Sequence, residues 1–188
     1  MDRTDPKTRI FVCLPLDHAA DEIEKFLAPL RIFRDYRWVT RAQLHITLKF
    51  IGEAAAERIT RLDSNLSRVG GSRPFGFSLS SAGFFPNAGR AGTIWLGVGD
   101  GSERVAKLAD SVDRAAVASG FERERRAFHP HITLARARGG TECPTPPELL
   151  VSLEKAPSLT ETCDRFILMK SVLSPAGAVY SPLAEYPL

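Results

Sequence analysis

Two copies of the tetrapeptide His-Ile-Thr-Leu carry the residues of this sequence that are best suited to chemistry. His45 and Thr47 belong to the first copy, and His131 and Thr133 belong to the second. Histidine titrates near neutral pH and can either donate or accept a proton. A threonine hydroxyl can donate a hydrogen bond to a phosphate oxygen without adding charge. Because the chain has only four histidines, we interpret the two copies as parts of one site.

An in-line displacement at phosphorus needs the parts that these four residues supply. One group must take a proton from the nucleophile, and another must protonate the leaving oxygen. Further hydrogen-bond donors must hold the remaining phosphate oxygens. The pair of motifs therefore predicts acid–base chemistry on a phosphate, which requires no metal if the leaving alkoxide is protonated.

Each motif lies in a segment whose pattern is typical of a β-strand. Segments 43–53 and 128–138 alternate in residue type and end at Gly52 and at Gly139-Gly140. Residues i and i+2 of a strand share a face. Histidine and threonine should therefore point to one side in each segment, and isoleucine and leucine should point to the core.

The remaining pattern predicts the elements that must hold the two motif strands in place. We expect a helix after Asp17, which would be its N-cap, and a helix capped by Ser102 and ended by Gly120. Further predicted strands cover 9–16, 75–85, 92–99 and two segments around the turn "SPAG", and further predicted helices cover 54–71 and part of 144–157. No linker divides the chain, so we expect one α+β domain over 1–188, made of two similar halves.

Composition places the chain among ordinary globular proteins. Hydrophobic residues make up 44% and charged residues 25%, and the net charge is +3. This mild positive charge is compatible with an anionic partner but does not identify one. The N-terminal segment lacks the pattern of a signal peptide, and no apolar run has the length of a membrane span. We therefore expect a cytoplasmic protein without a membrane partner.

The sequence resembles a known family across nearly its whole length. The stretches "LHITLKFIGE" and "FHPHITLAR" are similar to the two H-x-T-x motifs of the two-histidine (2H) phosphoesterase superfamily. Within it, the match is to the RNA 2′,3′-cyclic phosphodiesterases, also called the 2′-5′ RNA ligase family. "RIFVCLPL", "FPNAGRAGTIWLGV" and the final "SPAGAVYSPLAEYPL" extend the resemblance to the rest of the chain.

The resemblance implies a fold, a reaction and a role for each motif residue. The fold would be bilobal and pseudo-two-fold, with two antiparallel sheets lining a central cleft and helices on the outside. The enzyme would open an RNA 2′,3′-cyclic phosphate to a 2′-phosphomonoester without a metal or cofactor, and would act as a monomer. His45 would be the general acid and His131 the general base, while Thr47 and Thr133 would hold the phosphate oxygens.

Other residues near the motifs are weaker candidates. Arg136 is the best of several arginines for binding phosphate. His129 precedes the second motif by two residues and has either a supporting or a purely structural role, and we expect His18 at the surface. Aromatic residues could stack on bases but more often fill cores; the candidates are Tyr36, Trp38, Phe84 and Phe85.

Several alternatives remain open from the sequence. The same site could join RNA ends through a 2′-5′ bond or act on another cyclic nucleotide. A protein of a different class would bind RNA ends through its histidines without turnover. A third possibility is a metal site built from His45, His129 and His131, although threonine is a poor ligand for Zn²⁺.

Overall fold

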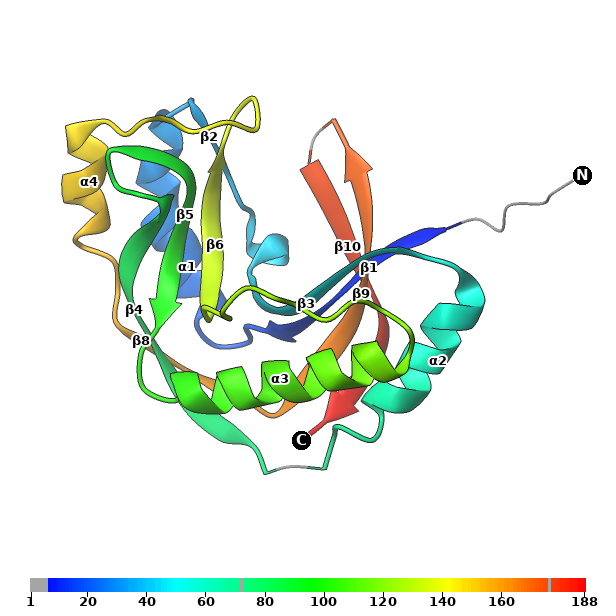
Figure 1. Cartoon of the computed structure of the whole chain (residues 1–188). Helices are drawn as coiled ribbons and strands as arrows, with labels where there is room; N and C mark the ends of the chain where they lie inside the picture. The colour runs from blue at the N-terminus through cyan, green and yellow to red at the C-terminus, as the bar shows by residue number, and fades with distance from the viewer. Residues whose placement is uncertain (1–6, 72, 176) are drawn as a thin grey trace, which may run out of the picture.

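The computed structural model describes residues 7–71, 73–175 and 177–188, which form ten β-strands and four α-helices (Figure 1). The strands are β1 (Thr8–Pro15), β2 (Tyr36–Trp38), β3 (His45–Ala54), β4 (Phe75–Pro86), β5 (Arg90–Val98), β6 (His131–Ala137), β7 (Cys143–Pro144), β8 (Leu159–Cys163), β9 (Arg165–Ser174) and β10 (Gly177–Pro187). The helices are α1 (Ala20–Leu27), α2 (Ala56–Leu66), α3 (Ser102–Ala118) and α4 (Pro147–Leu153), with 3-10 turns η1 (Ala28–Ile32) and η2 (Arg41–Gln43).

All ten strands belong to one antiparallel sheet. Its main order is β10-β9-β1-β3-β6-β5-β4-β8, with β2 paired to β6 and β7 paired to β5. The sheet curls, so that the β9–β10 hairpin and the strands β4, β5 and β6 stand on opposite sides of the molecule (Figure 1). The α+β class is confirmed. The expectation of two separate sheets is wrong, because pairing between β3 and β6 joins the two halves.

The junction between the halves consists of the two motif strands. β3 and β6 pair through Ile46 and Ile132, and this is the single residue pair assigned between them in the described chain. Each isoleucine is fully buried. The second residue of one HITL motif thus lies opposite the second residue of the other, which brings the two motifs together at the centre of the sheet.

Both motif strands contain a β-bulge at the same place in the motif. On β3, Cys13 of β1 pairs with Thr47, and Val12 pairs with Lys49, so that Leu48 is skipped. On β6, the pairing with β5 in the same way skips Leu134. A bulge adds one residue to one strand and reverses the alternation beyond it. Residues after each motif therefore point to the opposite side from the one that strict alternation predicts.

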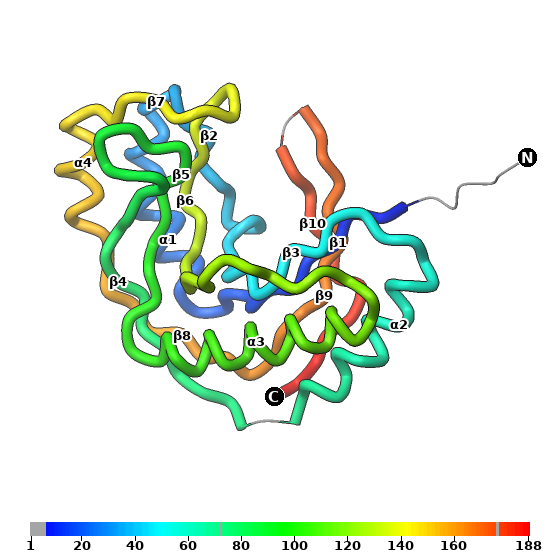
Figure 2. Tube along the Cα trace, viewed as in Figure 1, coloured from blue at the N-terminus to red at the C-terminus, as the bar shows by residue number. Residues whose placement is uncertain are grey.

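One apolar core extends through both halves of the sheet. It includes Ile10 and Leu14 from β1, Ile94 from β5, and Ile23 and Leu27 from α1, all with no more than 1% of their surface exposed. Helix α3 packs against α2 and β3. The chain trace shows α2, α3 and α4 at the periphery of the curled sheet, as expected (Figure 2).

Most predicted elements are present, but two predicted helix caps are wrong. Asp17 does not cap α1; its carboxylate pairs instead with Arg165 at 2.7 Å. The amides of His18 and Ala19 are bound by the Glu161 carboxylate from β8, a contact between residues far apart in the sequence. Ser102 is the first residue of α3, not its cap, which is Gly101 with a positive φ of 81°.

The sequence does not predict the short strands, because their alternation of apolar and polar residues is too short to indicate a strand. β2, β7 and β8 lie in segments that the sequence indicates to be irregular or leaves unassigned. The two predicted C-terminal strands are β9 and β10. The predicted turn "SPAG" includes residue 176, and the start of the N-terminal segment covers residues 1–6, which lie outside the described residues. Within the described part of the chain, no helix is both long and apolar enough to cross a membrane.

Candidate active site

The first motif holds its histidine in one defined orientation. His45 is the first residue of β3, and its Nδ1 lies 2.8 Å from the carbonyl oxygen of Gln43. A carbonyl only accepts, so Nδ1 carries a proton and donates it. The other ring nitrogen, Nε2, lies 3.0 Å from the hydroxyl of Thr47. In the neutral ring, Nε2 is therefore the atom available to take or give a proton.

The second motif repeats this arrangement. His131 is the first residue of β6, and its Nδ1 donates a hydrogen bond to the carbonyl oxygen of His129 at 2.6 Å. The acceptor is again the residue two positions earlier in the chain. Both histidines are half-buried, and in the neutral ring of each, Nε2 is the nitrogen that carries no proton. Two imidazoles in the same tautomer can act as an acid and a base once one of them is protonated.

The four motif side chains lie on one face of the sheet. His45 and Thr47 flank Ile46, and His131 and Thr133 flank Ile132. Because the two isoleucines are paired and buried, the flanking residues point to the opposite face. The structure thus brings the four predicted residues of the two motifs together on the face away from the core.

The pKa values of both histidines are shifted downwards. The pKa of His45 is lowered to about 4, mainly by burial, with smaller contributions from the charge of Arg136 and from that of His131 when protonated; the hydrogen bond to Gln43 acts in the opposite direction. Burial is also the main cause of the lowered pKa of His131, with smaller contributions from the charges of His129 and Arg136. Without a bound anion, both rings are therefore neutral at pH 7.

Arg136 lies at this site because of the bulge in β6. Strict alternation from His131 would place Arg136 on the core side, but the bulge at Leu134 brings it to the same face as Thr133. Its guanidinium donates to the hydroxyls of Thr93 at 3.2 Å and Thr133 at 3.4 Å. Arg136 is thus an exposed cation beside the second motif.

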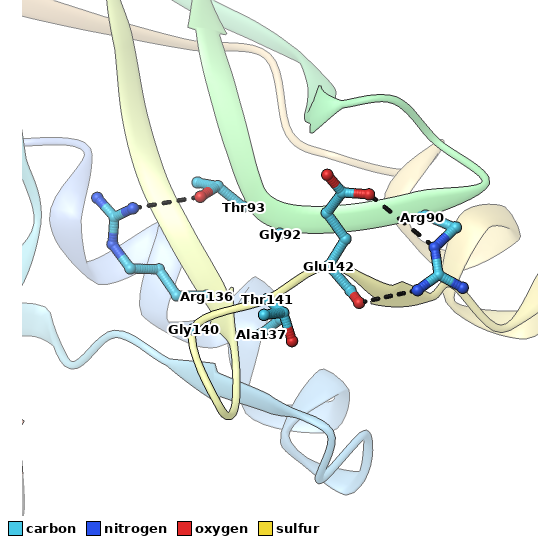
Figure 3. A pocket seen from close by; sticks show the side chains of 8 residues that line it. All are labelled: Arg90, Gly92, Thr93, Arg136, Ala137, Gly140, Thr141 and Glu142. Carbon is cyan, nitrogen blue, oxygen red and sulfur yellow. Dashed lines mark hydrogen bonds and ion pairs between the residues drawn. The ribbon is translucent and has the colours of Figure 1, made fainter.

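A cleft of about 530 Å³ lies on this face of the sheet. It is lined by residues of β1, β2, β3, β6, β9 and β10, including His45, Thr47, Thr133 and Arg136. A second cavity of about 570 Å³ lies on the other side of Arg136 (Figure 3). His131 does not line either cavity; its ring lies among Phe85, Trp95 and His129, at 5.2, 6.0 and 6.1 Å between centroids.

Each catalytic candidate has aromatic neighbours that the sequence did not identify. The ring of His45 lies 4.9 Å from Phe11 and 5.4 Å from Tyr180. Trp95 lies against Gly83 of β4, where any side chain would collide with the indole ring. These residues come from β1, β5 and β10. Their alternation marks them as strand residues, but nothing in the sequence indicates which face of the sheet becomes the site.

The weaker candidates from the sequence differ in their exposure and in their distance from the motifs. His129 is exposed and packs against Trp95 with its ring, at 4.7 Å between centroids. His18 is exposed, as expected. Phe85 is 37% exposed and packs on His131, while Tyr36 and Trp38 are buried. Phe84 packs against the core.

The described residues contain no group of three or more His, Cys, Asp or Glu side chains that could hold a metal ion. The alternative site built from His45, His129 and His131 therefore gains no support. Both motif histidines direct Nδ1 to a backbone carbonyl, and the ring of His129 packs against the aromatic residues next to the second motif.

Comparison with known proteins gives consistent matches. Residues 17–174 match the family described as the 2′-5′ RNA ligase superfamily. The chain is 33% identical over 141 residues to an RNA 2′,3′-cyclic phosphodiesterase of Aeropyrum pernix, covering 75% of this chain and 80% of that protein. A protein of the same name from Archaeoglobus fulgidus is 32% identical over 183 residues, covering 95% of this chain and 99% of that protein.

Solved structures with the same architecture extend over almost the whole chain. E. coli LigT complexed with 3′-AMP is 26% identical, with a TM-score of 0.73 and coverage of 97% of this chain and 99% of that one. TT0787 of Thermus thermophilus is 27% identical, with a TM-score of 0.75 and coverage of 96% and 97%.

Proposed function

The chain belongs to the 2′-5′ RNA ligase superfamily, and we propose that this protein opens the 2′,3′-cyclic phosphate at the end of an RNA to a 2′-phosphomonoester. Relatives named RNA 2′,3′-cyclic phosphodiesterase support this substrate. The observation that carries the proposal is the set of four side chains around the Ile46–Ile132 pair. Two histidines and two threonines, with Arg136 beside them, supply the parts that displacement at phosphorus requires.

In the proposed mechanism, each histidine uses Nε2. His131 takes a proton from a water molecule, whose oxygen attacks phosphorus. The bond between phosphorus and the 3′ oxygen breaks, and His45 gives the proton on its Nε2 to that oxygen. Thr47, Thr133 and Arg136 donate hydrogen bonds to the phosphate oxygens. No metal takes part, because protonation of the 3′ oxygen replaces the stabilisation that a cation would provide.

This assignment requires a protonated His45, whose pKa in the free protein is about 4. A bound cyclic phosphate carries a negative charge, and an opposite charge next to an imidazole raises its pKa. The substrate would thus bring its own general acid into the protonated state. Arg136, which lowers the pKa of both histidines, is neutralised by the same phosphate.

An approximate two-fold relation between the halves is part of the proposal. It is supported by the matching hydrogen bonds from Nδ1 to the carbonyl two residues earlier. The bulges at Leu48 and Leu134 match as well. Such a relation explains why one site needs two copies of the motif, since each half contributes one histidine and one threonine.

The name of the family favours a second reaction at the same site. If the 5′ hydroxyl of another RNA replaces water as the nucleophile, the same displacement makes a 2′-5′ phosphodiester bond. His131 would then take the proton from that hydroxyl. Adding RNA with a free 5′ hydroxyl to the reaction below, and analysing the products for a joined strand, tests this possibility.

The decisive experiment is product analysis on an oligonucleotide that ends in a 2′,3′-cyclic phosphate, in the presence of EDTA. We expect complete opening to the 2′-phosphate, identified by chromatography against 2′- and 3′-phosphate standards. His45→Asn and His131→Asn should each lose turnover by a factor of at least about 10², with unchanged circular dichroism. His18→Asn, an exposed histidine, is the matched control and should have wild-type activity.

Three results would contradict parts of this proposal. Loss of all turnover with EDTA would contradict the metal-free mechanism. Binding of the oligonucleotide without turnover would indicate an RNA-end binding protein. A near-normal rate in either motif variant would show that the acid and base assignments are wrong.

A further inference from the structure

A third cavity, of about 390 Å³, lies next to the catalytic cleft and is rich in arginine. We call it the arginine pocket, after the four arginines that line it: Arg31, Arg34, Arg37 and Arg138. Arg37 and Trp38 line both the pocket and the cleft that holds His45 and Arg136. The two cavities are therefore neighbours along β2, and a ligand bound in the cleft can extend into the pocket.

The arginine pocket has an excess of positive charge. No acidic side chain lines it among the described residues. Arg31 is balanced by Glu24 at 2.6 Å, and Arg138 donates through Nε to the carbonyl oxygen of Arg34 at 2.7 Å. Within the described part of the chain, the side chains of Arg34 and Arg37 make no ion pair or hydrogen bond, and both residues are exposed. Arginines without internal partners are available for an external anion.

The position of Arg37 strengthens this interpretation. β2 pairs with β6 in a register that places Arg37 directly opposite Arg136. Like charges directly opposite each other on neighbouring strands are destabilising. An anion bound between them would remove this repulsion. Arg37 thus connects the phosphate ligand of the catalytic cleft to the arginine pocket.

The cavity on the other side of Arg136 has a different charge balance. Its remaining arginine, Arg90, lies 3.9 Å from the carboxylate of Glu142 and donates to the carbonyl oxygen of the same residue at 3.2 Å (Figure 3). Apart from Arg136, the charges of that cavity therefore balance. A chain of phosphates leaving the cleft is attracted to the side of β2 and not to the side of Glu142.

We propose that the arginine pocket binds backbone phosphates of the nucleotides on the 5′ side of the cyclic end. This inference rests on the proposed function, since a 2′,3′-cyclic phosphate is always a 3′ end and the rest of the RNA must leave the cleft in one direction. The preferred substrate is then a single-stranded RNA end of several nucleotides. A cyclic mononucleotide fills the catalytic cleft only.

The test compares substrates of different length. The probes are oligoadenylates of one, three and ten nucleotides that end in a 2′,3′-cyclic phosphate, and the measured quantity is kcat/KM. For the wild-type protein we expect kcat/KM to rise roughly tenfold or more from one to ten nucleotides, because added phosphate contacts dominate affinity. In Arg34→Ala/Arg37→Ala, the ratio between the ten-nucleotide and one-nucleotide values should fall by roughly tenfold.

Salt dependence provides a second readout that a purely structural effect would not change. Each phosphate contact on a single strand contributes about 0.7 to the slope of log affinity against log salt. Loss of two contacts should reduce that slope by about 1.4 for the ten-nucleotide product, which carries a 2′-phosphate and is not turned over. Arg34→Lys/Arg37→Lys keeps both charges and should restore most of the slope.

The control variant is Arg90→Ala, in the cavity on the other side of Arg136. It removes one positive charge, where Arg34→Ala/Arg37→Ala removes two, and it should keep the wild-type length ratio. Equal kcat/KM at all lengths in the wild-type protein would overturn the inference, as would an unchanged ratio in Arg34→Ala/Arg37→Ala; a protein partner would then be the better occupant. Failure of the wild-type protein to open any of the three probes would instead contradict the proposed function.

Discussion

His45 shows how neighbouring groups set the charge of one side chain. Burial is the main cause of its lowered pKa, the charge of Arg136 and that of His131 when protonated add to it, and the carbonyl of Gln43 favours the protonated ring. The first effects dominate, so the free protein holds a neutral imidazole whose only available nitrogen is Nε2. A negatively charged substrate reverses this balance. In the proposed mechanism, substrate binding thus produces the protonation state that the reaction needs.

The pH profiles of kcat and kcat/KM test whether substrate binding raises the pKa of His45. Because kcat/KM reports the pKa values of the free enzyme and kcat those of the complex, the two profiles should differ. Both histidines have lowered pKa values in the free protein, so kcat/KM should be bell-shaped with its optimum below about pH 6.5, the ordinary pKa of histidine. The optimum of kcat should lie at higher pH, measured across the acid and alkaline range with a cyclic mononucleotide.

Arg136→Gln gives a further check on the same profile. The charge of Arg136 lowers the pKa of both histidines. Its removal should therefore shift both limbs of the kcat/KM profile to higher pH while reducing the rate. Superimposable profiles for kcat and kcat/KM in the wild-type protein would show that the phosphate does not raise the pKa of His45.

At the level of elements, one buried lysine joins β3 to α3 through an ion pair and to the segment before β6 through a hydrogen bond. Lys49, just after the bulge in β3, donates to the carboxylate of Asp113 on α3 at 2.6 Å and to the carbonyl oxygen of Glu122 at 2.8 Å. Asp113 also accepts from the amide of Glu124 at 3.1 Å. One lysine therefore connects the first motif strand, α3 and the segment before the second motif.

Removal of one partner of the Lys49–Asp113 pair should destabilise the fold. Lys49→Met removes the closer and buried cation of Asp113 and leaves this carboxylate only the exposed Arg123, at 3.8 Å. We expect the free energy of unfolding in urea to fall by about 3–5 kcal/mol. Lys49→Met/Asp113→Leu should recover part of the loss, because an apolar pair of similar size avoids the buried charge. The control is Lys25→Met, in the exposed pair with Glu22, which should have a much smaller effect. A small effect of Lys49→Met would contradict the structural role.

In the whole molecule, the two halves are held together mainly by a shared apolar core and less by backbone pairing. One residue pair joins β3 to β6 in the described chain, yet a single apolar cluster includes residues of both halves, such as Ile10 and Leu14 of β1 and Ile94 and Leu96 of β5. Burial of apolar surface is the main contribution to stability. The halves should therefore depend on each other for folding.

We expect the chain to unfold as one cooperative unit. Both tryptophans, Trp38 on β2 and Trp95 on β5, lie in the half that contains β6, so their fluorescence reports that half. Far-ultraviolet circular dichroism reports the backbone of the whole chain. Urea transitions measured by the two methods should coincide. A fluorescence transition at a clearly different midpoint would show that the halves are separate domains.

The sequence alone determined the motifs and the direction of their side chains. Alternation is a local property, because neighbouring residues of a strand point to opposite faces. His45, Thr47, His131 and Thr133 could therefore be assigned to one face each from their spacing. Most longer strands and helices could be predicted for the same reason. The family resemblance also predicted the class of enzyme, and the matching family and the relatives named RNA 2′,3′-cyclic phosphodiesterase agree with that prediction.

Only the tertiary structure decided which residues meet. Strand register depends on pairing between distant segments, which alternation does not encode. The bulge at Leu134 turned Arg136 to the face that carries His131 and Thr133, and the β2–β6 register placed Arg37 opposite Arg136. The pairing of Ile46 with Ile132 made one sheet where two were expected. These contacts form because one core buries Ile46 and Ile132, which leaves the polar residues of the two motifs together on the other side of the sheet.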